Sequence, residues 1–198
     1  MYMNGLVVCG GHSSRMGTDK SMLNYHGMQQ RYYIYNLLKS FCDKVYISCN
    51  KNQKENIETK YNYLVDKIED IGPMAALLRA FKEHETSWLT IGCDYPYIQQ
   101  KDISLLIENR NKNAVATTYY NTELKIPEPL LGIYEKNCKE LLSKEYNKQN
   151  YSLKHFLLEH DAHYIIPETM QTIQSVDTKE EYEIATRIVG DNTNHRQS

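Results

Sequence analysis

Apolar residues in this chain fall into two kinds of pattern, and the two kinds alternate. Short apolar, β-branched runs predict buried strands. They cover residues 6–9, 45–49, 63–65, 88–92 and 114–119. Longer stretches with apolar residues three and four positions apart predict helices. They cover residues 30–41, 72–82 and 101–109. Strands that alternate with helices predict an α/β fold with a mostly parallel central sheet, and right-handed crossovers make it a three-layer sandwich.

The remaining stretches are less regular. Residues 21–27 read as an irregular connector and the polar residues 51–61 as a weak helix or a loop. Pro127 and Pro129 are expected to break the chain before a strand at 130–134. Further expected elements are helices at 136–145 and 152–159 and late strands at 164–166 and 173–176.

The end of the chain carries a helix-start signal. Thr178 and Glu181 have the spacing of a capping box, which predicts a last helix from there to about residue 189. Residues 191–198 are polar, and we expect a frayed tail. No repeat or linker divides the chain, so residues 1–190 are expected to form a single domain.

Composition narrows the possible functions. The 198 residues carry a formal net charge of −2, which gives no overall field that would attract nucleic acid. The five cysteines form no C-x-x-C pair, which predicts reduced thiols in a cytoplasmic protein. No signal peptide pattern and no apolar run near the ~20 residues of a membrane span are present, so no membrane association is expected.

The first predicted strand leads directly into a candidate phosphate-binding loop. Gly10 and Gly11 follow the strand, and Arg15 and Lys20 add positive charge. Glycines let backbone N–H groups approach a ligand closely, and two cations suit a triphosphate. The loop matches neither G-x-G-x-x-G nor a Walker A motif. Two glycines alone would equally fit an ordinary strand-to-helix loop.

Three further predicted strands end in polar residues, namely Asn50, Asp66 and Asp94. Each could be a simple turn residue. In open α/β sheets, however, ligands bind outside the carboxyl ends of the strands. Asp94 is the candidate magnesium ligand, because Mg²⁺ prefers one or two carboxylates together with waters and substrate phosphates. The histidines form no H-x-x-x-H or H-E-x-x-H pattern, which disfavours a zinc site.

Several segments resemble one enzyme family. The loop residues that carry the resemblance are Gly10, Gly11, Ser13, Arg15, Met16, Gly17, Asp19 and Lys20. They look like the signature loop of nucleotidyltransferases of the molybdenum cofactor guanylyltransferase (MobA-like) type. Segments 72–76, 92–96, 127–134, 152–157 and 175–181 are also similar to that family. The chain departs from the family at Cys9, where alanine is usual, at residues 27–30, and at Asp177, where asparagine is usual.

The resemblance implies a Rossmann-like, GT-A-like nucleotidyltransferase fold and a reaction. GMP passes from GTP to the phosphate of molybdenum-bound molybdopterin, and pyrophosphate leaves. The catalytic residues it implies are Arg15, Lys20 and Asp94, with Mg²⁺ on Asp94. The nucleotide-binding residues it implies are Val8, Cys9, Gly10, Gly11, Arg15, Lys20, Asn50, Asp66 and Asp94. Asp70 rivals Asp66 as the nucleoside contact.

Other functions stay open at this point. The base could be cytosine, as in a molybdopterin cytidylyltransferase, or the acceptor a sugar or alcohol phosphate. A non-catalytic nucleotide-binding protein is a third possibility, which the presence of both Lys20 and Asp94 disfavours. Transient contact with other molybdenum cofactor or molybdoenzyme proteins would fit the resemblance.

Overall fold

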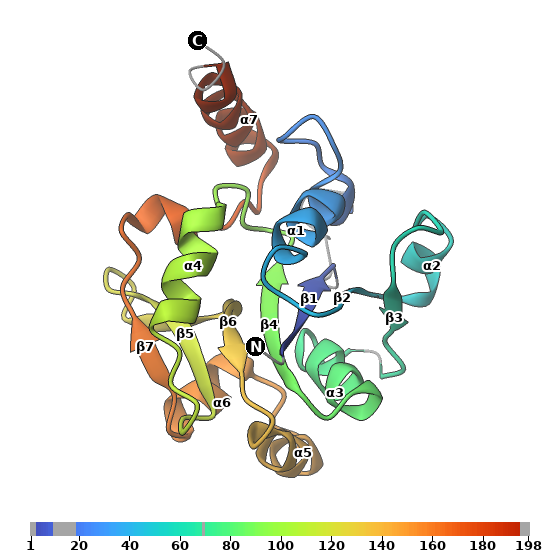
Figure 1. Ribbon diagram of the computed structural model, residues 1–198, viewed down its shortest axis with the longest axis vertical. Coiled ribbons are helices and arrows are strands. Elements are labelled where there is room, and N and C mark those ends of the chain that lie inside the picture. The colour runs from blue at the N-terminus through green and yellow to red at the C-terminus, as the bar shows by residue number, and fades with distance from the viewer. Residues whose placement is uncertain (1–2, 10–18, 69, 195–198) are drawn as a thin grey trace.

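The computed structural model describes residues 3–9, 19–68 and 70–194, with side chains described up to residue 190. Its centre is one seven-stranded sheet in the order β3-β2-β1-β4-β6-β5-β7 (Figure 1). The strands are β1 (Met3–Val8), β2 (Val45–Cys49), β3 (Tyr63–Val65), β4 (Ser87–Gly92), β5 (Ala116–Asn121), β6 (Ile126–Tyr134) and β7 (His163–Ile165). The expected α/β class is therefore confirmed.

The sheet is mostly parallel, as predicted. β1 lies parallel to both β2 and β4, and Val8 is in register with Ser48 on one side and Gly92 on the other. β3 and β7 also join in parallel, whereas β6 runs antiparallel to β4 and β5. Because β3, β2, β1 and β4 point the same way, their carboxyl ends share one edge of the sheet.

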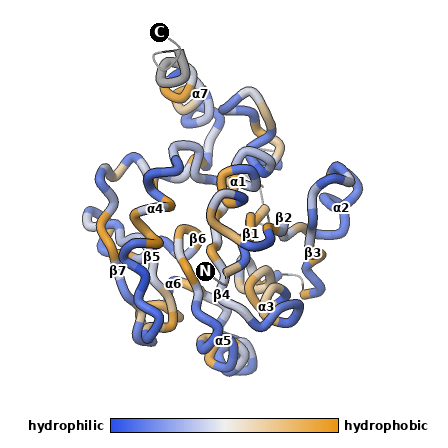
Figure 2. The backbone as a smooth tube through the Cα atoms, viewed as in Figure 1, coloured by the Kyte–Doolittle hydropathy of each residue, from blue (hydrophilic) through white to orange (hydrophobic). Residues whose placement is uncertain are grey.

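Helices cover both faces of the sheet. The α-helices are α1 (Gln30–Leu38), α2 (Lys51–Lys54), α3 (Met74–Glu83), α4 (Gln100–Glu108), α5 (Cys138–Asn147), α6 (Leu153–Glu159) and α7 (Lys179–Asn194). Two 3₁₀ turns are η1 (Lys20–Met22) and η2 (Met170–Ile173). The apolar residues concentrate in the central strands and in the helices over them, while α2 is hydrophilic (Figure 2).

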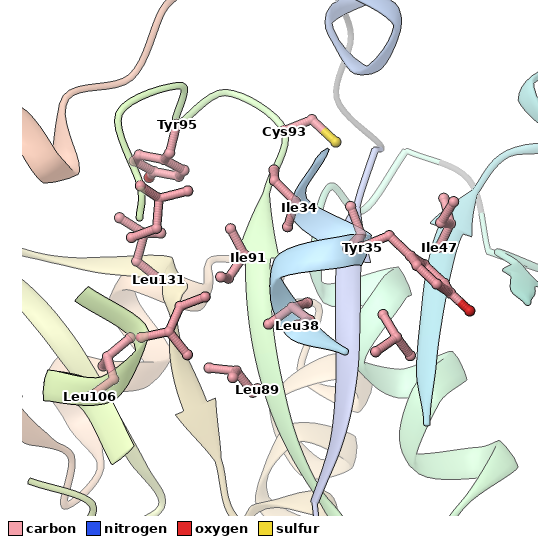
Figure 3. Close-up of a cluster of buried hydrophobic side chains, with 14 of the residues drawn as sticks. Ile34, Tyr35, Leu38, Ile47, Leu89, Ile91, Cys93, Tyr95, Leu106 and Leu131 are labelled. Carbon is pink, nitrogen blue, oxygen red and sulfur yellow. The ribbon is translucent and has the colours of Figure 1, made fainter. Parts of the chain in front are cut away.

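Alternation along β1 shows how the two faces are buried. Val7 lies in one apolar cluster, which includes side chains of α1 and α4 such as Ile34 and Leu106 (Figure 3). Leu6 and Val8 point to the opposite face and lie in a second cluster, with side chains of α3, α5 and α6. Side chains of a strand alternate between faces, so a strand covered on both sides is apolar throughout. The two clusters lie between the sheet and the helices on each of its faces, so the fold has the three layers that were predicted.

Two expectations about strands were wrong. β6 runs through Pro127 and Pro129, which were expected to break the chain. The pairing register of β5 and β6 shifts beside these prolines, and Thr118 Oγ1 donates to Glu128 O (2.6 Å) there. An irregular ladder tolerates the missing proline N–H groups. Residues 173–176 form no strand either, because Met170–Ile173 is the turn η2.

The last helix begins as predicted but extends further. Thr178 Oγ1 accepts from Glu181 N (3.2 Å), and Glu181 Oε2 accepts from Thr178 N (2.9 Å), which is the expected capping box. The helix continues to Asn194 rather than ending near residue 189, so the backbone of 191–194 is helical. Residues 195–198 lie outside the described part of the chain. None of the described helices is long and apolar enough to cross a membrane.

Candidate active site

A cavity of about 460 Å³ lies at the carboxyl ends of β1 and β4. It is lined by residues at the ends of these strands, by η1, by the residue before α3, by the β5–β6 hairpin, by α6 and by the segment before α7. The lining residues are Val8, Cys9, Lys20, Pro73, Cys93, Asp94, Tyr95, Leu124, Ile126, Glu128, Pro129, Leu130, Lys154, Ser175 and Asp177. Parallel strands of an α/β sheet bind ligands at this edge.

The cavity brings together four residues that the sequence singled out, namely Val8, Cys9, Lys20 and Asp94. Three others, Gly10, Gly11 and Arg15, lie outside the described residues. Asn50 and Asp66 follow β2 and β3 at the same edge of the sheet, but they are not among the residues that line the cavity.

Asp94 is held close to the end of β4. Its backbone carbonyl accepts from Val176 N (2.9 Å), which joins the segment before α7 to this strand. A Cβ atom built on Gly92 would lie 2.4 Å from Asp94 Oδ1, so glycine at that position makes room for the carboxylate. Burial raises the pKa of Asp94 to about 6, Lys20 lowers it, and the charges of Asp177 and Glu128 raise it further.

Lys20 forms an ion pair with Asp177, more than 150 positions away in the chain. Ser175 Oγ also donates to Asp177, to Oδ2 (3.2 Å). Sequence reasoning noted Asp177 only as a departure from the family pattern and did not expect it beside Lys20. The signal was its place in the segment 175–181 that resembles the family.

The cavity lining also includes the acidic side chain of Glu128 and the lysine Lys154. Glu128 accepts from the Tyr95 hydroxyl (2.9 Å), and its pKa is raised chiefly by burial. The hydrogen bond from Tyr95 and the positive charge of Lys154 both lower that pKa. Sequence reasoning missed both residues. Lys154 carried no signal, because a lysine on a short helix is ordinarily a solvated surface residue.

The two ends of segment 10–18 are tied together by one side chain. Gln53 Nε2 donates to Cys9 O (3.2 Å) and to Asp19 Oδ2 (3.0 Å). Asn50 forms a capping box with Gln53, with hydrogen bonds of 2.8 and 3.0 Å. Asn50 thus holds Gln53 in place, which is a positioning role that its strand-end location did not reveal.

Asp66 is a half-buried carboxylate beside β2. Ser48 Oγ donates to its Oδ1 (2.6 Å), and burial raises its pKa to about 6. Its rival Asp70 adopts a positive φ of 61° in the loop before α3. Neither aspartate lines the cavity, so the cavity lining does not decide which of the two is the better candidate for the nucleoside contact.

The donor set suits a hard cation. Asp94 and Asp177 line one cavity, and the negative charge of Asp177 raises the pKa of Asp94 because the two carboxylates repel each other. A divalent cation between them would relieve this repulsion, and Mg²⁺ is bound through one or two carboxylates with waters and phosphates. Among the residues that the structure describes, no group of three or more His, Cys, Asp or Glu side chains is placed to hold a metal.

The model of a known domain family, described as "MobA-like NTP transferase domain", matches residues 5–163, which is most of the chain. The chain belongs to this family. The family resemblance predicted from the loop is thereby confirmed, and the family is one of NTP transferase domains. Most of the signature loop, residues 10–18, lies outside the described part of the chain.

Individual relatives of this MobA-like chain support the same assignment. It is 35% identical over 184 residues to the "Molybdenum cofactor biosynthesis bifunctional protein" of Synechocystis sp., covering 90% of this chain and 52% of that protein. The chain thus spans about half the length of that relative. It is 29% identical over 189 residues to a Bacillus cereus (strain Q1) protein named "Probable molybdenum cofactor guanylyltransferase", covering 90% and 92% of the two chains.

A solved structure shares the fold of this MobA-like chain. The molybdopterin-guanine dinucleotide biosynthesis protein A from Archaeoglobus fulgidus superposes with a TM-score of 0.79. The match covers 95% of this chain and 99% of that one, at 18% identity. This likeness confirms the nucleotidyltransferase type of fold that the loop resemblance implied.

Proposed function

We propose that this chain transfers GMP from GTP to the phosphate of molybdenum-bound molybdopterin, with release of pyrophosphate. The observation that carries the proposal is the meeting of Lys20, Asp94 and Asp177 in one cavity at the carboxyl ends of the strands. The names of the relatives in Synechocystis and Bacillus cereus support the same pathway. The reaction itself needs little acid–base chemistry, because the acceptor is already an anionic phosphate.

Charge neutralisation and positioning carry most of such a reaction. An acceptor phosphate oxygen forms a bond to the α-phosphorus of GTP, and the bond from that phosphorus to pyrophosphate breaks. We assign the triphosphate to the backbone of Gly10 and Gly11 and to the side chains of Arg15 and Lys20. Lys20 then offsets negative charge both on the bound nucleotide and on the departing pyrophosphate.

We assign a Mg²⁺ ion to Asp94, with Asp177 as the second carboxylate. Mg²⁺ held there would offset the negative charge of the phosphates. The Lys20–Asp177 ion pair holds the lysine at the cavity before nucleotide enters. Phosphate oxygens compete with Asp177 for the ammonium group, which would leave this carboxylate available as a metal ligand.

The nucleoside is assigned to the other side of the strand ends. Backbone groups of Val8 and Cys9, together with Asn50 and Asp66, are the proposed contacts. Guanine presents N–H donors on one edge, so acceptors such as a carbonyl or the Asp66 carboxylate suit it. Because Asn50 already caps α2 with Gln53, its contribution is expected to be to hold that helix start in place.

The acceptor is assigned to the part of the cavity that Lys154 lines. Lys154 supplies a positive charge there. The lining residues Leu124, Ile126 and Pro129 add apolar surface to the cavity. An anionic phosphate attached to a flat organic group fits such a combination. Lys154 and Asp94 line the same cavity.

A nucleotide comparison tests the proposal. The protein is incubated with Mg²⁺, molybdenum-bound molybdopterin and GTP, CTP, ATP or UTP in turn, and pyrophosphate and the dinucleotide product are measured. We expect efficient transfer with GTP alone among the four. Preference for CTP would assign the protein to cytidylyl transfer, and pyrophosphate release only with a sugar phosphate acceptor would contradict the proposed acceptor. The Glu85→Gln variant, altered at an exposed ion pair with Lys139, serves as the matched control.

A further inference from the structure

Three cysteines form a row across the central strands. Val8 of β1 is in register with Ser48 of β2 and with Gly92 of β4. The next residue of each chain segment is a cysteine, so Cys49, Cys9 and Cys93 lie side by side in that order. All three side chains belong to the same apolar cluster and therefore point to one face of the sheet.

The contacts of this row are unequal. The Sγ atoms of Cys9 and Cys93 lie 3.4 Å apart. The Sγ of Cys49 faces the carbonyl oxygen of Leu64 instead, at 3.7 Å. Cys9 and Cys93 also line the candidate active-site cavity, whereas Cys49 is fully buried and does not. Both residues of the first pair therefore adjoin the cavity, although their side chains are buried.

The backbone geometry suits a covalent link between these two thiols. Adjacent strands lie about 4.8 Å apart, and disulfides join Cα atoms about 4.4–6.8 Å apart. Cys93 N donates to Val8 O (3.1 Å), so the backbone pairing continues up to the two cysteines. The sulfurs would have to approach from 3.4 Å to about 2.05 Å, the length of an S–S bond.

We propose that Cys9 and Cys93 form a reversible disulfide when the protein meets a hydroperoxide, and that this disulfide inactivates the adjoining active site. The loss of activity rests on the function proposed above, whereas the formation of the disulfide does not. The described cysteines are all free thiols, so this structure represents the reduced form.

The chemistry balances with a hydroperoxide as the oxidant. The Cys9 sulfur attacks the outer peroxide oxygen, the O–O bond breaks, and an alcohol or water leaves with the second oxygen. The resulting sulfenic acid is attacked by the Cys93 sulfur, which forms the S–S bond and releases water. Two thiols are oxidised by two electrons, and the peroxide is reduced by the same two. A dithiol reductant reverses the change by thiol–disulfide exchange.

The expected consequence follows from what adjoins the two cysteines. Cys93 directly follows the end of β4 (Figure 3). Asp94 is the next residue in the chain. The carbonyl of Cys9 accepts from Gln53, which also holds Asp19 at the far end of segment 10–18. Drawing the two sulfurs together displaces these groups. A misplacement near 1 Å at a reacting centre lowers activity by about 100-fold.

Peptide mapping tests the disulfide directly. The full-length protein, without substrates, is treated with hydrogen peroxide, blocked with a thiol-specific alkylating reagent and digested. We expect a cross-linked peptide pair that contains Cys9 and Cys93, the loss of those two free thiols, and their return after treatment with dithiothreitol. Circular dichroism confirms that the oxidised protein is still folded. A folded protein without this cross-link, or with Cys9 found only as sulfinic acid, would overturn the proposal.

The two flanking cysteines provide matched variants. Cys49→Ala and Cys93→Ala each remove one strand-end neighbour of Cys9. We expect Cys49→Ala to keep the cross-link and Cys93→Ala to abolish it, with pyrophosphate release compared with each variant's own reduced activity. In Cys93→Ala, peroxide can still oxidise Cys9 to a sulfenic acid, but no cross-link can follow. A reversible loss of activity that accompanies the cross-link is therefore expected in the unaltered chain and in Cys49→Ala, and not in Cys93→Ala. A Cys9–Cys49 cross-link in the unaltered chain, or full activity of the cross-linked protein with GTP, would contradict the proposal.

Discussion

Buried charged side chains are arranged differently at the two ends of the central strands. At the amino end of β4, Arg110 binds Glu135 through two bonds of 2.6 and 2.8 Å, and Ser87 donates to the same carboxylate (2.7 Å). Both charged side chains are buried, and their opposite charges form an ion pair. At the carboxyl end, Asp94 faces Asp177 and Glu128, and its pKa is raised to about 6.

The difference separates a structural charge from a functional one. A planar guanidinium with two bonds to one carboxylate leaves little for a ligand to gain. The acidic groups beside Lys20 repel one another, so a cation and an anionic substrate can each improve that site. A perturbed carboxyl in a cavity is the arrangement expected of a functional site.

The largest expected effect is the loss of the proposed metal ligand. Asp94→Asn removes a charge but keeps the shape of the side chain, and we expect transfer activity with Mg²⁺ to fall by about 1000-fold or more. The melting temperature should not decrease, because a half-buried repelled carboxylate contributes little to the core. Pyrophosphate release and thermal unfolding are measured on the same sample. Near-normal turnover in a folded variant would remove Asp94 from the site.

The contrasting change is at the amino end. Arg110→Ala leaves Glu135 buried without its partner, and we expect the free energy of unfolding to fall by about 3–5 kcal/mol. Lys139→Ala breaks an ion pair with the exposed Glu85 at the same 2.6 Å separation and should cost about 0–1 kcal/mol. Urea unfolding of both variants makes the comparison. Equal losses would show that burial does not separate these pairs.

Lys20→Ala should act on rate rather than on folding. We expect transfer with GTP to lose about 2–4 kcal/mol of transition-state stabilisation, because the ammonium offsets phosphate charge. Steady-state kinetics give the Michaelis constant and the turnover number, and Lys139→Ala is the matched control. If both constants stayed within about twofold of the unaltered enzyme, the assignment of Lys20 to the phosphates would fail.

Base selection is expected to be a smaller effect. We expect GTP to exceed ATP and CTP by about tenfold or more in transfer efficiency, since a buried acceptor left unpaired costs about 1–3 kcal/mol. Asp66→Asn should narrow this preference more than it lowers turnover with GTP, and Asp70→Asn tests the rival position. Competition between nucleotides measures the ratio. Equal use of all four triphosphates would contradict a base-reading pocket.

The smallest effect concerns stability and pH. Burial raises the pKa of both Asp66 and Asp94 to about 6 in the folded protein. A raised carboxyl pKa stabilises the fold at low pH, and this contribution is lost as the pH rises through about 6. In metal-free protein, the melting temperature relative to the Asp66→Asn, Asp94→Asn double variant should therefore decrease between about pH 4 and 7. A difference that is flat across this range would contradict the raised values.

Local pattern alone determined much of this molecule. Apolar runs defined β2 and β3 at their observed bounds, and Thr178 with Glu181 marked the start of α7. Lys20 and Asp94, which the sequence singled out, both line the cavity, because the carboxyl ends of parallel strands meet at one edge of the sheet. These features depend on residues that are neighbours in the chain or on a general rule of topology.

Tertiary structure decided the contacts that join distant segments. Nothing local in the sequence pairs Lys20 with Asp177 or places the sulfur of Cys9 against Cys93 rather than Cys49. Pro127 and Pro129 predicted a break in the chain, yet β6 continues through both residues. The irregular pairing with β5 does not require the backbone N–H groups that proline lacks. Register and side-chain direction across strands arise only when the sheet assembles, so the partners of these residues could not be read from the chain in order.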